Sequence, residues 1–227
     1  MWDWKTLYSD EHFATKYGVI KGTCGKHCNG CKGDCYVAKN YSSIESGKGT
    51  FRPSCRDGHA RNTLALNEGG IYYVYESLNG QINRAKNKPA VIRINESGEI
   101  QSYVEFTELW CRLASDHPEI SFYVYTKNYA AVTKAFEREL VPANLTVLIS
   151  VWHEYGIEEY KALESFDNVK CFAYDDGFDY ESHGLTLTTY CKAYDKNGKM
   201  DHNITCDKCR KCFNRNANSK CIGCMAH

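Results

Sequence analysis

The chain has 227 residues, enough for one sizeable domain or for a domain with a small extension. Hydrophobic residues make up 43% of it and charged residues 25%, which is ordinary for a globular protein, and no apolar run approaches the roughly 20 residues of a membrane helix. The charges balance, with 28 Lys and Arg against 28 Asp and Glu, so the chain lacks the overall basic character of most nucleic-acid binders. We see no secretory signal and expect a cytoplasmic protein with no membrane partner.

Cysteine is the outlying residue type, with 13 copies. An odd number, the lack of a signal and the tight C-x2-C spacing argue against a disulfide framework. Two cysteines at this spacing direct their sulfurs into one small volume, which suits a metal better than a distant cross-link. The sequence therefore predicts a reduced protein built around cysteine-metal sites.

The first predicted strand, residues 17–22, leads directly into a loop with the spacing C-x3-C-x2-C-x3-C. Its cysteines are Cys24, Cys28, Cys31 and Cys35. Iron–sulfur clusters commonly take several cysteines from one short segment, whereas zinc sites usually pair two knuckles across a longer gap. The spacing favours a [4Fe-4S] cluster over structural zinc, which stays the alternative.

The middle of the chain is predicted to alternate strands and helices. A less regular region with apolar stretches at 59–66 and 72–78 comes first. Five more strands follow at 90–95, 120–127, 145–152, 169–174 and 185–191, and three apolar stripes at 106–113, 129–136 and 157–166 fit helices in the gaps. This alternation implies an α/β fold with a parallel sheet. We expect a partial (β/α)6 barrel-like sheet in residues 1–191 and a cysteine-rich, metal-binding C-terminal extension in residues 192–227.

In such folds the chemistry lies at the C-terminal ends of the strands. Because the first cysteine loop follows the first strand, its metal is expected at that rim. Other polar and aromatic residues near predicted strand ends are pocket candidates, although each type is more often structural: Arg93, Glu96, Tyr125, Lys127 and Trp152. His59 and Arg61 are further candidates.

The C-terminal cysteines form a second predicted metal site. Its members are Cys206, Cys209, Cys212, Cys221 and Cys224. Four of them give C-x2-C-x11-C-x2-C, a zinc-knuckle spacing, while Cys212 extends the first half into a ferredoxin-like C-x2-C-x2-C run. Zinc and a second [4Fe-4S] cluster both remain open here, as does a single centre shared with the first loop.

Four cysteines stand alone in the sequence: Cys55, Cys111, Cys171 and Cys191. Cys111 lies in a helical pattern and Cys171 in a strand pattern, where buried cysteine acts as a small hydrophobe. Cys191 ends a strand shortly before the second group and is a possible extra ligand.

Cys24-x3-Cys28-x2-Cys31 after a first strand resembles the radical S-adenosylmethionine (SAM) enzymes. The resemblance implies a [4Fe-4S] cluster on these three cysteines, with one iron open to SAM. It also implies a turn after the second strand that contacts the SAM amino group, and Ser97, Gly98 and Glu99 look like a variant of that turn. Two features depart from the pattern: Gly30 stands where an aromatic residue is usual, and Cys35 is a fourth thiol that would close the cluster if it ligates.

A closer resemblance is to a phage-encoded family described as gene product eighty-eight. It rests on the loop ending in Cys35-Tyr36, the Arg-Ile-x-x-Ser-Gly-Glu segment at 93–99, the strand at 122–127 and the C-terminal cysteine run, and it spans about 22–224. It implies a site more firmly than a reaction, and a host-cell cytoplasm as the location.

Two functions follow as expectations. The first is a radical SAM-type enzyme, in which the cluster and SAM generate a radical that abstracts a hydrogen from an unknown substrate. The second is a non-catalytic phage protein, with a closed cluster or zinc, that binds a host protein or nucleic acid. An iron–sulfur redox sensor is a third.

Overall fold

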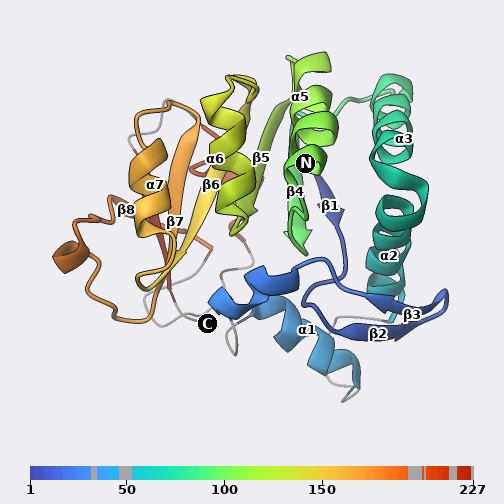
Figure 1. The fold of residues 1–227 in the computed structure, drawn as a ribbon, viewed down its shortest axis with the longest axis horizontal. Coiled ribbons are helices and arrows are strands. Elements are labelled where there is room, and N and C mark those ends of the chain that lie inside the picture. The colour runs from blue at the N-terminus through green and yellow to red at the C-terminus, as the bar shows by residue number, and fades with distance from the viewer. Residues whose placement is uncertain (32–34, 46–52, 194–200, 202, 215–218, 226–227) are drawn as a thin grey trace.

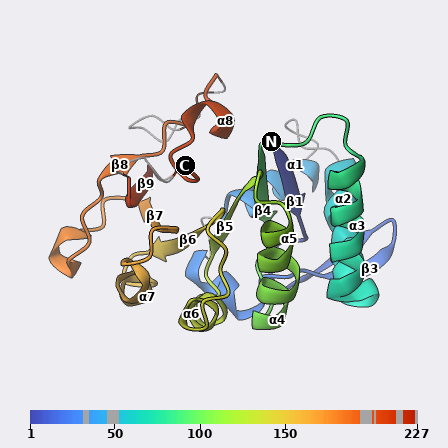
Figure 2. The ribbon, with the colours of Figure 1, turned by 90° about the horizontal axis from the view of Figure 1, so that it is seen from above.

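The computed structural model describes residues 1–31, 35–45, 53–193, 201, 203–214 and 219–225, without the side chains of residues 28–30, 36, 40 and 43–45. Within these residues the chain forms a seven-stranded sheet and a separate two-stranded hairpin (Figure 1). Helices cover one face of the sheet, and the C-terminal segment carrying α8 lies on the other (Figure 2). The protein is therefore an α/β fold with unlike layers on its two faces.

The sheet has the strand order β1-β4-β5-β6-β7-β9-β8, and every pairing in it is parallel. Its strands are β1 (Trp2–Lys5), β4 (Val91–Ser97), β5 (Ser121–Thr126), β6 (Leu145–Trp152), β7 (Val169–Asp175), β8 (Thr189–Tyr190) and β9 (Cys221–Met225). The antiparallel hairpin consists of β2 (His12–Thr15) and β3 (Gly18–Lys21). The sheet is not closed into a barrel, and its parallel α/β character confirms the predicted fold class.

The helical layer follows the same chain order. Its elements are α2 (Pro53–Leu64), a π turn (Ala65–Gly69), α3 (Gly70–Arg84), α4 (Tyr103–Glu105), a π turn (Phe106–Cys111), α5 (Arg112–Asp116), α6 (Tyr129–Glu137) and α7 (Ile157–Leu163). Outside this layer lie a 3-10 helix (Gly25–Cys31), α1 (Tyr36–Glu45), a 3-10 turn (Glu181–His183) and α8 (Cys206–Cys209). The apolar stripes predicted at 106–113 and 129–136 form helix, that at 157–166 forms helix as far as Leu163, and the irregular region after the cysteine loop contains α2 and α3.

The strand predictions need two corrections. The strand predicted at 17–22 exists as β3, but it pairs in the hairpin and not in the main sheet, because a local pattern does not specify a partner. The strand predicted at 185–191 shortens to Thr189–Tyr190. The main sheet gains β1 and β9, which the sequence did not indicate.

The central strands explain why the sheet forms. β6 reads Leu-Thr-Val-Leu-Ile-Ser-Val-Trp and is buried along seven of its eight residues. Such runs of branched and apolar residues suit a parallel strand covered on both faces. The helix face is covered by α3 to α7, and the opposite face by a smaller apolar group with Tyr123, Leu148, Phe213 and Ile222.

A buried lysine anchors the C-terminal segment on that second face. Lys170 of β7 is 2% exposed, and its ammonium donates to the carbonyl oxygens of Lys211 (2.6 Å) and Asn214 (2.9 Å). It also donates to the hydroxyl of Ser219 at 3.4 Å. Hydrogen bonds from a charged donor are stronger than neutral ones, so this side chain fixes how Lys211, Asn214 and Ser219 lie on the sheet.

A buried carboxyl group orders the chain after β4. Glu105 accepts hydrogen bonds from the Gln101 backbone N–H (2.8 Å) and from the Trp110 indole (3.1 Å). Burial raises the pKa of Glu105 to about 7, and these two donors oppose that rise. The fold therefore favours the protonated acid, whose stabilising contribution is complete below the ordinary pKa and is lost as the pH rises through about 7.

We expect Glu105→Gln to flatten the pH dependence of stability. The wild-type free energy of unfolding should fall between pH 4.5 and pH 7 by an extra amount on the order of 3 kcal/mol from this group. The amide cannot ionise, so the variant should lose that slope. Its NH2 group cannot accept one of the two hydrogen bonds, which should cost about 1 kcal/mol at pH 5. Urea unfolding at several pH values measures both. Glu108→Gln, an exposed neighbour, is the control and should keep the wild-type slope; an unchanged slope in Glu105→Gln would contradict the assignment.

Candidate functional site

The N-terminal cysteine loop lies at the C-terminal edge of the sheet, next to the ends of β4 and β5 (Figure 1). The backbone N–H of Thr23 donates to the Leu7 carbonyl (2.9 Å), and that of Cys24 to the Ser9 carbonyl (2.8 Å). The Glu99 backbone N–H donates to the Thr23 hydroxyl at 3.0 Å. The segment after β1 thus carries the cysteines to the rim predicted for them, although β3 is not a strand of the sheet.

The described thiols of this loop lie together. Cys31 is hydrogen-bonded to Cys35, and Cys24 is close enough to Cys35 to act on it electrostatically. The hydrogen bond from Cys31 lowers the pKa of Cys35 to about 7 against the effect of burial, and the same contact raises the pKa of Cys31. The side chain of Cys28 lies outside the described residues. Cys35 therefore belongs to the same group of thiols as Cys24 and Cys31.

Lys127, at the end of β5, is the cation of this site. Burial alone would lower the pKa of its ammonium, but Cys31 and Glu99, followed by Cys24 and Cys35, outweigh it and raise the pKa. The ammonium also hydrogen-bonds to Cys31 and lies 5.2 Å from the centre of the Trp152 ring. The arrangement stabilises negative charge on the sulfur atoms.

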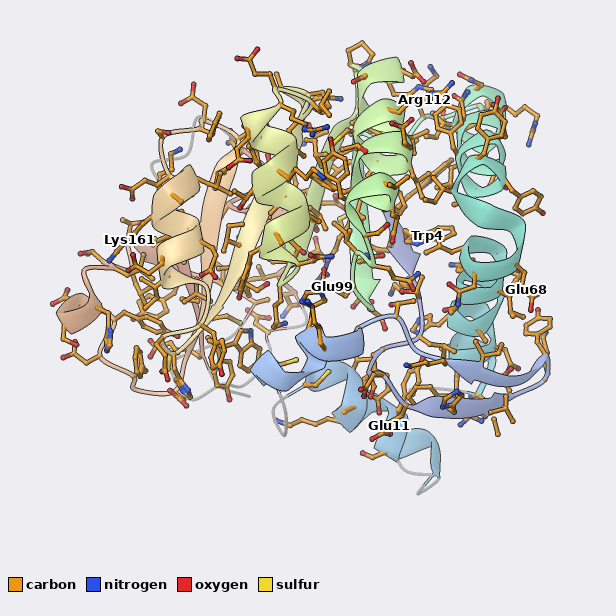
Figure 3. The ribbon with its side chains drawn as sticks, in the orientation of Figure 1. Trp4, Glu11, Glu68, Glu99, Arg112 and Lys161 are labelled. Carbon is orange, nitrogen blue, oxygen red and sulfur yellow. The ribbon has the colours of Figure 1, made fainter. Side chains whose placement is uncertain are left out.

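The turn of Ser97, Gly98 and Glu99 joins the loop to the sheet. Glu99 lies between the strand ends and the cysteine loop (Figure 3). Its carboxylate accepts from the Thr126 hydroxyl (2.6 Å) and from the backbone N–H groups of Lys127 (2.8 Å) and Ile100 (2.9 Å). The Ser97 hydroxyl donates to the Thr6 carbonyl at 2.8 Å. These contacts hold the turn in place against the ends of the neighbouring strands.

A hollow of about 910 Å³ opens beside the loop, between it and α6. Its lining includes His27 and Lys127 from the rim, Lys134 from α6, Arg138 directly after α6, and Tyr155. The His27 ring is hydrogen-bonded to the Lys127 backbone, and burial lowers the pKa of this imidazole. The hollow therefore borders the cysteine loop at Lys26 and His27.

The C-terminal cysteines lie on the other face of the sheet, and they do not all face the same way. Cys206 and Cys212 approach Tyr123 and Tyr125, and the Tyr125 hydroxyl donates to the Cys212 sulfur at 2.9 Å. Cys209 is close to Cys206. Cys224 is hydrogen-bonded to Cys191, a cysteine outside the predicted run.

Cys221 is separated from that group. It packs in the main core, hydrogen-bonded to Cys171 and to Tyr160 of α7. Side chains alternate between the two faces of a strand, so Cys221 and Cys224, three positions apart on β9, point in opposite directions. As the described residues are placed, no three His, Cys, Asp or Glu side chains form a group that could hold a metal ion.

The comparisons with known proteins bear on the family. A family model described as Gene product 88 matches residues 5–222. The chain belongs to this phage gene-product family. Neither the comparison with curated proteins nor that with solved structures gives a match. Among the described residues of this Gene product 88 member, no helix has the length and apolar character to cross a membrane.

The other predicted pocket residues divide between the two sides of the sheet. Arg93 and Tyr125 belong to the face of the C-terminal cysteines, and the Arg93 guanidinium lies 5.0 Å from the centre of the Tyr125 ring. Glu96 forms an ion pair with Lys5 at 3.0 Å. Of the predicted set, Lys127 and Trp152 thus lie at the first cysteine loop.

The remaining candidates of this Gene product 88 chain have packing partners. His59 is buried and hydrogen-bonded to the Tyr41 hydroxyl at 2.7 Å, and burial lowers the pKa of its imidazole to about 4. Arg61 lines a second hollow, of about 620 Å³, next to β1. Burial raises the pKa of the Cys111 thiol to about 12, as expected for a cysteine serving as a small hydrophobe.

Gly98→Ala should destabilise the fold by about 2–4 kcal/mol. Gly98 has φ +87°, and a Cβ there would meet the Thr6 hydroxyl oxygen at 1.9 Å. Gly177→Ala is the matched control, because Gly177 has φ +98° but no atom within 4 Å of the added Cβ, and it should cost about 1 kcal/mol. Chemical denaturation measures both; equal losses would show that backbone strain alone acts at Gly98.

Lys127→Gln should weaken retention of any metal on the first loop about 10–100-fold, because it removes the cation that faces the sulfur atoms. Lys26→Gln is the control: it removes one positive charge from the same loop, but the Lys26 side chain is exposed. Metal per chain after timed incubation with a chelator measures retention. Equal losses of metal in the two variants would show that Lys127 acts only through its positive charge and not through its position beside the sulfur atoms.

Proposed function

We propose that this chain is an iron–sulfur protein whose N-terminal loop holds a [4Fe-4S] cluster at the edge of the sheet. The observation that carries this proposal is the gathering of three described thiols around one lysine ammonium: Cys24, Cys31 and Cys35 beside Lys127. Thiolate-bound clusters are anionic, and their stability depends on nearby hydrogen bonds and charge. The residue types, thiols beside a cation, suit such a group, although as the described residues are placed the three sulfur atoms do not form a metal-holding arrangement.

The ligand set is proposed to include Cys28, whose spacing places it between Cys24 and Cys31 in the same helical turn region. None of the described cysteines forms a disulfide, which is the state that cluster assembly requires. This supports a reducing compartment, and the host cytoplasm is the proposed location.

The finer proposal is a radical SAM-type enzyme acting on an unknown substrate. When bound with an open iron, such a cluster supplies one-electron chemistry to SAM. The chain's own residues would hold the rim of the sheet in a fixed conformation and leave space for a small molecule. Glu99 fixes the Thr126–Lys127 backbone, Ser97 and Gly98 hold the turn against Thr6, and the hollow beside His27 leaves room for a small molecule.

A second candidate is a non-catalytic phage protein with a closed cluster or zinc on the same loop. The contact between Cys31 and Cys35 favours it, because a fourth thiol at the group leaves no open coordination position. Such a protein would act by binding a host protein or, against the balanced charge, a nucleic acid. Whether Cys35 is a ligand of the bound metal distinguishes the two functions.

Anaerobic purification followed by analysis of iron, sulfide and zinc tests the proposal. We expect iron and sulfide in the wild type, and loss of about four iron atoms per chain in Cys24→Ala and Cys31→Ala. Cys55→Ala, a half-buried cysteine of α2, is the control and should retain them. Zinc without sulfide in the wild type would overturn both iron–sulfur hypotheses.

The spectrum of the reduced protein with and without SAM then separates the candidates. A SAM-dependent change and release of 5′-deoxyadenosine, both kept in Cys35→Ala, support the enzyme. A spectrum indifferent to SAM, with the cluster lost in Cys35→Ala, supports the closed site.

A further inference from the structure

The face of the sheet opposite the helices gathers cysteines from three separate parts of the chain. Cys191 follows β8, Cys206 and Cys212 lie in and after α8, and Cys224 lies on β9. The Cys191 backbone N–H donates to the Gly223 carbonyl at 2.8 Å. This hydrogen bond places Cys191 next to Cys224, which follows Gly223 on β9. Pairing of the last two strands thus creates this group.

The sulfur atoms of the group interact with one another. Cys191 and Cys224 are hydrogen-bonded. Cys212 interacts electrostatically with Cys191, Cys206 and Cys224. Cys191 and Cys206 also interact. Four thiols from distant segments are thus near enough to interact on one face of the sheet, whereas Cys221 contacts Cys171 on the other face.

Cations and hydroxyl groups face these thiols. The Arg93 guanidinium acts electrostatically on Cys191, Cys206 and Cys212. The Tyr125 hydroxyl donates to Cys212 at 2.9 Å, and the Tyr123 hydroxyl is hydrogen-bonded to Cys206. Groups of this kind orient thiolate ligands and offset their charge in metal sites.

The surroundings of these thiols are apolar, which favours a buried metal site over a solvent-exposed polar patch. Cys191 and Cys212 pack against the buried group of Tyr123, Leu148 and Ile222. Cys224 is 6% exposed. Four converging thiols suit a metal that prefers sulfur, either zinc or an iron–sulfur cluster.

We propose a second thiolate metal site on this face, held by Cys191, Cys206, Cys212 and Cys224. Compared with the zinc-knuckle spacing of the sequence, Cys191 takes the place of Cys221 and Cys212 takes the place of Cys209. As the described residues lie, the four sulfur atoms do not form a metal-holding group. Zinc–sulfur bonds are about 2.3 Å long, so the proposed metal-bound form requires the sulfur atoms of Cys206 and Cys212 to lie closer to those of Cys191 and Cys224. The site is independent of the N-terminal loop and of the function proposed for it.

Metal analysis in a Cys24→Ser/Cys31→Ser background tests the proposal, because that full-length chain lacks the first site. It should retain zinc without sulfide, or iron and sulfide in equal amounts; either result supports a thiolate centre and identifies its metal. Adding Cys191→Ser should lower the bound metal at least about tenfold. Adding Cys221→Ser should leave it unchanged, although Cys221 is the more buried residue and the harsher test of folding.

A second measurement needs no substitution on this face. The background chain is alkylated under native conditions before and after treatment with a chelator, and the modified cysteines are mapped by mass spectrometry. Chelation should increase the labelling of Cys191 and Cys224 and leave that of Cys221 unchanged. The proposal is overturned by a background chain without metal, by metal lost in Cys221→Ser but kept in Cys191→Ser, or by chelator-independent labelling of Cys191.

Discussion

The carboxylate of Glu99 is the interaction on which the rim of this protein depends. It accepts three hydrogen bonds from residues at the ends of neighbouring strands, and the Glu99 backbone N–H reaches Thr23, one residue before Cys24. Parallel strands bring their C-terminal ends to one edge but do not align the loops beyond those ends. Here a single buried carboxylate sets the position of Lys127 relative to the cysteine loop, so the backbone itself brings the cation and the thiols together.

The two thiol groups share one electrostatic arrangement. Adjacent strands each supply a cation, Arg93 from β4 to the C-terminal cysteines, where Lys211 also acts, and Lys127 from the end of β5 to the N-terminal loop. Each cation lies among sulfurs in poorly hydrated surroundings, where a charge without a partner is costly. The sheet therefore carries two separate anion-stabilising environments.

Sequence reasoning found the elements whose evidence is local. The buried, mostly apolar β6 was predicted with its observed bounds, and three helical segments were predicted from their apolar stripes. β1 was missed because four residues with alternating polarity, Trp-Asp-Trp-Lys, carry little signal alone. β9 was missed because Cys-Ile-Gly-Cys was interpreted as a metal knuckle. On a strand this spacing places the two cysteines on opposite faces. The approach of Cys191 to Cys224 depends on strand pairing between distant parts of the chain, which no local pattern specifies.

The position of β9 has a consequence for how the protein is made. β9 is the last described strand along the chain, yet it lies between β7 and β8 and is the partner of both. During synthesis, β7 and β8 emerge from the ribosome before the strand that joins them. Until residues 221–225 are released, the parallel edge of β7 is open, and unpaired edges invite association with other chains. The sheet is therefore completed only after β9 has been released. A nascent chain, or a chain shortened before residue 221, would expose the unpaired edge of β7 that β9 covers in the folded protein.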